Sequence, residues 1–175
     1  MTRIVLAAVS IAGLLAQQPA YSQAVARPAD VSSMDAIVAA LYDVISGSGG
    51  QPRDWDRMRS LFVPGARLIP STATDHGATV RVLDVDGYIE RVRPNFERNG
   101  FFEREIARKT ESFGNIAHLF STYESRHAAS DAAPFARGIN SIQLLKDGDR
   151  WWIVTVFWDA ERPGNTLPAQ YLPKK

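Results

Sequence analysis

The feature that most constrains the fold is a change of pattern at Asn99-Gly100, where helix-like sequence gives way to strand-like sequence. Beyond this pair, four long segments alternate between apolar and polar residues, at 101–112, 115–129, 137–148 and 149–161. A period of two is typical of strands. Gly114-Asn115 and residues 147–149 predict tight hairpins, and residues 130–135 predict a wider loop. We therefore expect four consecutive antiparallel strands.

The sequence before this point predicts three helices, each opened by a capping residue: Ser32 or Ser33, Asp54 and Asp84. The first carries one apolar face made of Ile37, Leu41, Val44 and Ile45. Pro94 is expected to kink or shorten the third helix. Two short strands, at 66–71 and 79–83, separate the second helix from the third. Helices followed by a run of strands predict an α+β fold in which helices cover one face of a curved sheet.

The first residues do not fit this domain. "MTRIVLAAVSIAGLLA" has one basic residue, Arg3, then an apolar run, and small residues follow at 22–26. This pattern is typical of a secretory signal peptide, and the run is shorter than the roughly 20 residues of a spanning helix. We predict a signal peptide at 1–24, a leader at 25–32, a domain at 33–160 and an irregular Pro-rich tail at 161–175. The expected location is periplasmic or secreted, without membrane attachment after cleavage; an uncleaved anchor is the alternative.

Composition excludes several classes of function. The whole chain has 20 basic and 19 acidic residues, and without Arg3 the counts are equal, so a nucleic-acid partner is not expected. The chain has no cysteine, so its core must hold the fold without disulfides. The histidines at 76, 118 and 127 lack metal-ligand spacing, and no phosphate loop or nucleophile motif occurs. We expect neither a metal nor a cofactor.

Four segments carry a resemblance to a known family: "DAIVAALYDVI", "WDRMRSLF", "IAHLFSTYES" and "KDGDRWWIVTVFW". In this order they resemble the NTF2-like superfamily, which includes SnoaL-like and ketosteroid-isomerase-like proteins, over residues 34–159. The resemblance implies a cone: N-terminal helices packed against a strongly curved, mainly antiparallel sheet, around an open-mouthed pocket. It also implies a homodimer through the outer sheet face. The isomerases of this family use an aspartate on the first long strand, and residues 67–70 here contain no acid.

Alternation within the strands selects candidate site residues. Between 116 and 126 one row runs from apolar to hydroxyl side chains, as a pocket wall would: Ala117, Leu119, Ser121, Tyr123 and Ser125. The predicted ligand-binding residues are Tyr42, Leu119, Ser121, Tyr123, Asn140 and Trp158. Tyr42 and His118, together with Tyr123, are the candidates for acid–base catalysis, which requires at least two of them in one cavity. The alternative for the row is plain packing, with Tyr123 hydrogen-bonded in the core.

Two further strands have faces to assign. Arg104 and Arg108 would suit an anionic ligand if they faced inward, and the alternative is a solvated edge with cross-strand pairs. In the tryptophan-rich strand, unbroken alternation places the side chains of 151, 153, 155 and 157 on one face and those of 152, 154, 156 and 158 on the other. Both faces are apolar, so one is expected to pack on the helices and the other on a second subunit or a covering segment of the chain.

These observations leave three functions open. The first is an exported domain that binds a small apolar or amphipathic molecule in its cone without catalysis. The second is an isomerase, dehydratase or cyclase that uses pocket tyrosine or histidine side chains as acids and bases. The third is a protein-interaction module that uses the outer sheet face and the tail. The C-terminal tail is expected either to wrap across the sheet edge or the pocket mouth through Tyr171 and Leu172, or to fray.

Overall fold

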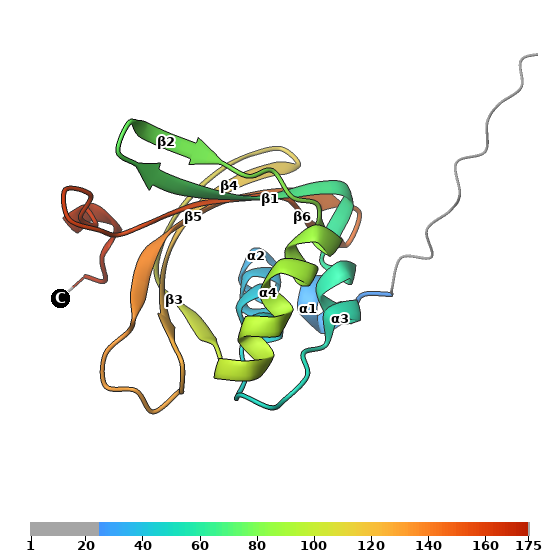
Figure 1. The fold of residues 1–175 in the computed structure, drawn as a ribbon. Coiled ribbons are helices and arrows are strands. Elements are labelled where there is room, and N and C mark those ends of the chain that lie inside the picture. Colours follow the sequence, from blue (N-terminus) through green and yellow to red (C-terminus); the bar gives the residue numbers. More distant parts are fainter. Residues whose placement is uncertain (1–24, 175) are drawn as a thin grey trace, which may run out of the picture.

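The computed structural model describes residues 25–174, so the predicted signal peptide lies outside the described residues. The elements in chain order are α1 (Pro28–Val31), α2 (Met34–Ile45), α3 (Trp55–Ser60), β1 (Phe62–Thr74), β2 (Gly77–Val80), α4 (Val85–Asn99), β3 (Phe102–Phe113), β4 (Ile116–Arg126), β5 (Ala136–Asp147), β6 (Arg150–Ala160) and a short 3-10 helix, η1 (Ala169–Tyr171) (Figure 1). The predicted α+β class is confirmed. Within residues 25–174, no helix is long and apolar enough to cross a membrane.

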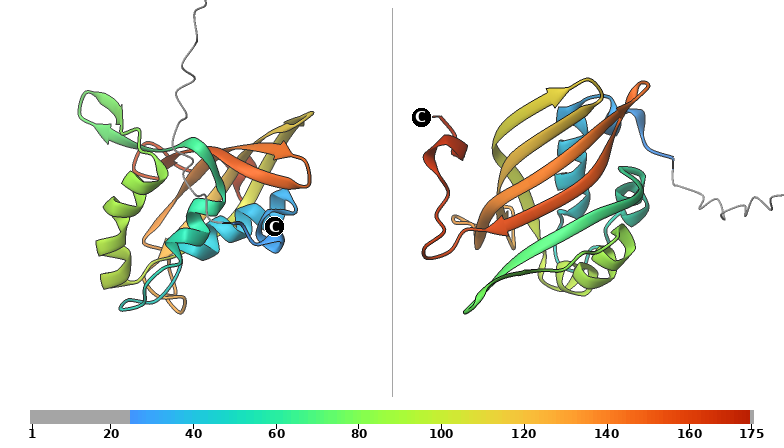
Figure 2. Two further views of the ribbon diagram at one scale, coloured as in Figure 1. Left: turned by 90° about the vertical axis from the view of Figure 1, so that its right-hand side faces the viewer. Right: turned by 90° about the horizontal axis from the view of Figure 1, so that it is seen from above.

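One six-stranded sheet organises the molecule. Its order is β2-β1-β6-β5-β4-β3, and every neighbouring pair is antiparallel except β1 with β6, which is parallel. The four strands after residue 100 form a meander, and β1 joins its far side beside β6 (Figure 2). The sheet curves around α2 and α4, which lie in its concave side (Figure 1). The core therefore lies between this concave face and the helices.

The helices begin where their capping residues stand. Ser33 Oγ accepts from the Ala36 amide at 3.0 Å, Asp54 Oδ1 from the Arg57 amide at 2.9 Å, and Asp84 Oδ1 from the Gly87 amide at 2.8 Å. The predicted shortening at Pro94 is wrong, because α4 continues to Asn99. Pro94 and Glu90 both lie on the exposed side of α4, so water can satisfy the carbonyl that loses its partner.

A β-bulge in β6 changes which tryptophan-strand residues face the core. Gln143 pairs with Thr155 but Leu144 pairs with Ile153, so Val154 is an extra residue. Ile153 and Val156 are therefore both buried, at 0% and 5% exposure, while Phe157 is 44% exposed. The predicted unbroken alternation from 151 to 158 is wrong, because the bulge reverses the faces after Ile153.

The C-terminal tail lies on the convex face of the sheet. Thr122 Oγ1 donates to the Tyr171 carbonyl at 2.6 Å, and the Tyr171 ring lies 5.2 Å from that of Phe120. Earlier in the tail, the Leu167 amide donates to Glu161 at 3.1 Å. The tail therefore packs on the sheet near its β3 edge rather than fraying, and none of its described residues lines the cavity between sheet and helices.

Candidate functional site

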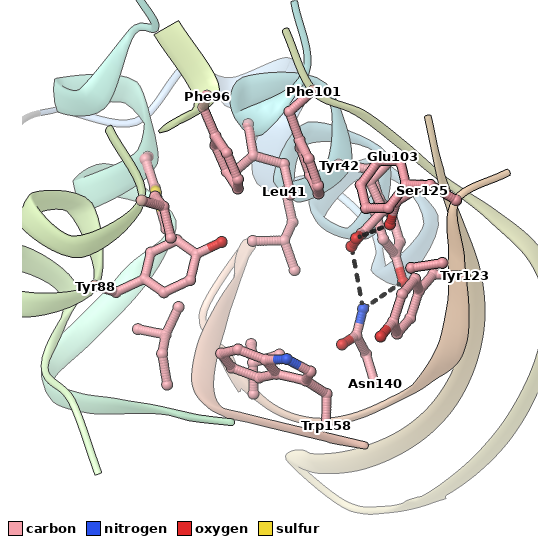
Figure 3. A pocket seen from close by; sticks show the side chains of 17 residues that line it. Leu41, Tyr42, Tyr88, Phe96, Phe101, Glu103, Tyr123, Ser125, Asn140 and Trp158 are labelled. Carbon is pink, nitrogen blue, oxygen red and sulfur yellow. Dashed lines mark hydrogen bonds between the residues drawn. The ribbon is translucent and has the colours of Figure 1, made fainter. Parts of the chain in front are cut away.

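A cavity of about 250 Å³ opens between the concave face of the sheet and helices α2 and α4 (Figure 3). Most of its wall is apolar, with aliphatic residues such as Leu41 and Leu68. The aromatic part of the wall comes from α2, α4, the connection before β3, the loop before β5, and the sheet: Tyr42, Tyr88, Phe96, Phe101, Tyr123, Phe135 and Trp158. Phe135 is 51% exposed, which places it at the rim.

One buried arginine connects the turn after α2 to α4 beside the cavity. Arg53 is 8% exposed and donates hydrogen bonds to carbonyls of the turn after α2 and, at 3.3 Å, to the Phe96 carbonyl. Gly47 and Phe101 exchange two backbone hydrogen bonds, of 2.7 and 3.0 Å. The rings of Phe96 and Phe101 stack with centroids 4.0 Å apart. These contacts hold two aromatic side chains of the cavity in place.

A small polar cluster interrupts the apolar wall. Ser125 Oγ donates to a Glu103 carboxylate oxygen at 2.7 Å. Asn140 Nδ2 donates to the Tyr42 hydroxyl at 3.0 Å and makes a longer contact of 3.5 Å to Glu103. Tyr42 also bonds Ser121 at 2.7 Å, which fixes its hydroxyl from behind. Figure 3 shows the bonds among the cavity residues as dashed lines.

Glu103 is the chemically distinctive member of this cluster. Burial raises the pKa of its carboxyl group to about 7, while the hydrogen bonds from Ser125 and Asn140 favour the anion and limit the rise. Among residues 25–174, no ion pair includes Glu103. The residue is half-buried and is one of those that line the cavity. Near neutral pH this carboxyl group can therefore accept a proton, release one, or bind a ligand through hydrogen bonds.

Two tyrosine hydroxyls in the cavity lack a protein partner. Tyr88 and Tyr123 are 9% and 5% exposed, and neither hydroxyl makes a hydrogen bond to any residue between 25 and 174. The Tyr88 hydroxyl points into the hollow (Figure 3). Burial, together with the negative charge of Glu103, raises the pKa of both phenols above their usual value. Both hydroxyls therefore remain neutral hydrogen-bonding groups that a ligand can satisfy.

The structure brings together four of the six predicted ligand-binding residues, and the ligand-binding role itself stays a prediction. Tyr42, Tyr123, Asn140 and Trp158 line the cavity. Leu119 and Ser121 do not line it. Both are completely buried, and Ser121 stands behind Tyr42.

The pairing of Tyr42 with His118 for catalysis is wrong. His118 Nε2 lies 2.8 Å from Ser141 Oγ, on the outer face of the sheet. Its strand neighbour Leu119 faces the core, and adjacent residues of a strand point to opposite faces. His118 and Tyr42 therefore cannot act in one cavity.

Neither Arg104 nor Arg108 of β3 lines the cavity. Arg104 faces outward, where it pairs with Glu124 at 2.5 Å, as the solvated-edge alternative requires. Arg108 is engaged by Glu105 and Asp35, both at 2.7 Å. Of the two alternatives left open for these arginines, anion binding is therefore excluded, and Arg104 fits the solvated edge with a cross-strand pair.

Sequence patterns missed Glu103, Tyr88 and the two stacked phenylalanines. Glu103 stands opposite Ser125 in the β3–β4 pair, and Ser125 belongs to the row predicted to line a pocket. Glu103 could therefore have been found as a residue that pairs across the strands with this row. Within residues 25–174, no group of three or more His, Cys, Asp or Glu side chains could hold a metal ion.

The described geometry defines a class: an α+β cone with a cavity between its helices and a curved sheet. No protein-family model matches the sequence, and no curated protein matches it. Solved structures do match it. A protein of unknown function with a cystatin-like fold from Nostoc punctiforme has a TM-score of 0.53 and 10% identity, over 70% of this chain and 84% of that chain.

Two other solved structures are similar to this chain to a comparable degree. An NTF2-like protein of unknown function from Silicibacter pomeroyi has a TM-score of 0.50 and 16% identity, over 73% of this chain and 92% of that chain. LinA has a TM-score of 0.50 and 7% identity, over 71% of this chain and 80% of that chain. The chain has the NTF2-like fold, as the sequence resemblance predicted. Identities this low show the fold alone.

Proposed function

We propose that this protein binds a small amphipathic molecule in its cone. The observation that carries the proposal is the cavity itself: an aromatic and aliphatic wall with a few polar groups at fixed positions. Small-molecule sites have this composition, since apolar walls supply binding energy and a few polar groups fix orientation. The free hydroxyls of Tyr88 and Tyr123 and the carboxyl group of Glu103 are the groups that a ligand would satisfy.

The size of the cavity limits the ligand. Its volume of about 250 Å³ lies just below the range of roughly 300–1,000 Å³ that is usual for ligand pockets. The ligand is therefore compact, with about one ring and a short side chain.

Export through residues 1–24 is part of the proposal and rests on their sequence pattern alone.

A thermal-shift screen with compact aromatic and alicyclic molecules tests the proposal. A ligand at 100 times its dissociation constant adds about 2.7 kcal/mol of stability, which raises the melting temperature by several degrees. The Leu41→Phe variant fills the cavity and should abolish the shift. Its matched control is Leu145→Phe, in a half-buried position on the outer face, which should leave the shift intact. A shift that survives Leu41→Phe, or a screen without any shift, would contradict binding in the cone.

The same experiment separates binding from catalysis, the second candidate function. The carboxyl group of Glu103, whose pKa of about 7 suits proton transfer at neutral pH, favours an acid–base enzyme. Each ligand found in the screen is recovered after incubation and examined by mass spectrometry and NMR. An unchanged ligand supports binding alone. A ligand converted by the protein, but not by Glu103→Gln, supports the enzyme.

A further inference from the structure

We infer that the polar end of the ligand is a positively charged amine, held between the Glu103 carboxylate and the aromatic rings of the cavity. The inference rests on the proposed function, because it specifies the ligand of that same cavity. Its three supports are the charge of the lining residues, the lack of an ion-pair partner for Glu103 among residues 25–174, and the arrangement of the rings.

The first support is the charge of the wall. Among the lining residues, Glu103 alone has an acidic or basic side chain, and no lysine, arginine or histidine joins it. An anionic ligand would meet a carboxylate without any compensating cation. A cationic ligand would meet its counter-ion, in surroundings where the attraction is stronger than in water.

The second support is that no basic side chain neutralises Glu103. Glu124, on the neighbouring strand, has Arg104 and Arg126 against its carboxylate. Glu105, two residues from Glu103, has Arg108 at 2.7 Å. Among residues 25–174, the carboxylate of Glu103 receives hydrogen bonds from Ser125 and Asn140 and has no ion-pair partner. A largely buried carboxylate without a counter-ion is costly, so a cation that enters the cavity removes a penalty of the empty state.

The third support is the set of rings around the hollow. Figure 3 shows Tyr88, Phe96, Phe101, Tyr123 and Trp158 on different sides of it. The faces of aromatic rings attract cations within about 6 Å, and several rings around one site are the known means of binding alkylated ammonium groups. The apolar remainder of such a ligand would contact the aliphatic part of the wall.

The cation should bind better as pH rises through neutrality. The ionisable groups that face Glu103 are phenols from three elements: Tyr42 of α2, Tyr88 of α4 and Tyr123 of β4. Burial keeps the pKa of each phenol above its usual range, so none of them changes charge near pH 7.

Charged groups also lie in the polar hollow on the far side of Glu103. They are Asp43 of α2, Arg104 of β3, Arg126 of β4 and Asp131 of the following loop. Arg104 and Arg126 are paired with Glu124, and Asp43 with Arg57. Glu103 is therefore the group whose ionisation controls the affinity for a cation.

Isothermal titration calorimetry with three matched probes tests the inference. The probes are 2-phenylethylamine, 2-phenylethanol and phenylacetate, which present a cation, a neutral group and an anion on the same ring at about pH 8. We expect the amine to bind about tenfold more tightly than the alcohol, and phenylacetate not to bind. Glu103→Gln should remove the preference for the amine while the alcohol still binds. Glu111→Gln, on the exposed far part of β3, is the matched control and should change nothing.

A second measurement needs no variant. Benzyltrimethylammonium keeps its charge at every pH, so its affinity for the unaltered protein should increase about tenfold between about pH 5.5 and pH 8, while that of 2-phenylethanol stays constant. Equal or tighter binding of the alcohol, or a constant affinity for the ammonium ion, would overturn the inference and leave the proposed function standing. Failure of all three phenyl probes to bind would count against both.

Discussion

At the scale of single residues, neighbours decide what a glutamate does in this protein. Glu124 and Glu103 lie on adjacent strands and on opposite faces of the sheet. Hydrogen bonds from Arg126 and Arg104 hold the pKa of Glu124 below its usual value. Burial without a cation raises the pKa of Glu103 to about 7. The first acid is a structural ion-pair partner, and the second is available to a ligand.

This contrast predicts opposite pH dependences of stability. The pKa of Glu103 is raised from 4.5 in the unfolded chain to about 7 in the folded protein. The contribution of this group to the free energy of unfolding is therefore fully present below pH 4.5 and is lost as pH rises through 7. Replacing Glu103 with Gln removes that loss. Relative to the unaltered protein, Glu103→Gln should gain on the order of 3 kcal/mol of stability between pH 4.5 and pH 8, by urea unfolding.

The matched variant Glu124→Gln should show the reverse trend. The pKa of Glu124 is lowered, so its contribution is present above its unfolded pKa and is lost as pH falls. Glu124→Gln should therefore be most destabilising at neutral pH and least destabilising in acid. Parallel pH profiles for the unaltered protein and Glu103→Gln would refute the assignment of Glu103 as a buried, uncompensated acid.

At the scale of elements, two β-bulges decide which side chains form the site. The tight turn at Gly114-Asn115 pairs Phe113 with Ile116, and counting back along both strands from this pair would place Arg104 opposite Ser125. The bulge between Glu105 and Ala107 shifts the register by one residue, so Glu103 stands there instead. One extra residue thus exchanges an inward cation for an inward acid.

These bulges also explain what the sequence could predict. Caps, turns and strand periodicity depend on neighbouring residues, so the helix starts, the hairpins and the inward row of β4 were predictable. The bulges at Ile106 and Val154 depend on how the sheet bends around α2 and α4. The residue type at these two positions does not indicate a bulge. The row containing Tyr123 was therefore recognised, while Glu103 was assigned to no site.

A glycine opposite the cavity tyrosine gives a prediction for the β5 strand. Gly138 pairs with Tyr123, and a Cβ atom there would lie 2.4 Å from the Asp159 carbonyl and 2.6 Å from the Tyr123 hydroxyl. Gly138→Ala should destabilise the protein by about 2 kcal/mol, because the β6 backbone must move. It should also weaken ligand binding by displacing Tyr123.

The control for this substitution is Gly87→Ala in the first turn of α4. There the nearest atom to a new Cβ would be the Asp84 carboxylate oxygen at 3.1 Å, and alanine favours a helix. Its stability should change by less than about 1 kcal/mol by the same urea unfolding. Equal stabilities for the two variants would show that the close approach at Gly138 is not a constraint.

At the scale of the whole molecule, the two faces of the sheet have different coverings. The concave face is closed by helices, and part of the convex face is covered by the tail through Tyr171. Phe113, Ile116 and Phe157 remain 84%, 60% and 44% exposed on the strands of the meander. An apolar surface of this kind favours association, so the homodimer expected through this face remains our proposal. The tail limits how much of the face a second copy can reach.

Removing the tail should therefore strengthen self-association. Deletion of residues 166–175 uncovers Phe120 and Thr122, and the shortened chain should dimerise at a lower concentration than the intact protein in sedimentation analysis. Tyr171→Ala should lie between them, since it removes the ring contact with Phe120 and leaves the backbone of the tail. An identical sedimentation profile for all three proteins over the whole concentration range would contradict a role for the tail in limiting association.

The parallel pairing of β1 with β6 has a consequence for how the chain folds. β1 ends at Thr74 and β6 begins at Arg150, so 75 of the 175 residues intervene between two strands that must meet. Such distant contacts fold slowly, because a long loop must close before any contact compensates for its lost entropy. During synthesis on the ribosome, α2, β1 and α4 emerge with apolar faces whose last partner does not yet exist. The cavity is therefore completed by the final strand of the domain, and a nascent chain that stops short of Trp158 has no site to offer a ligand.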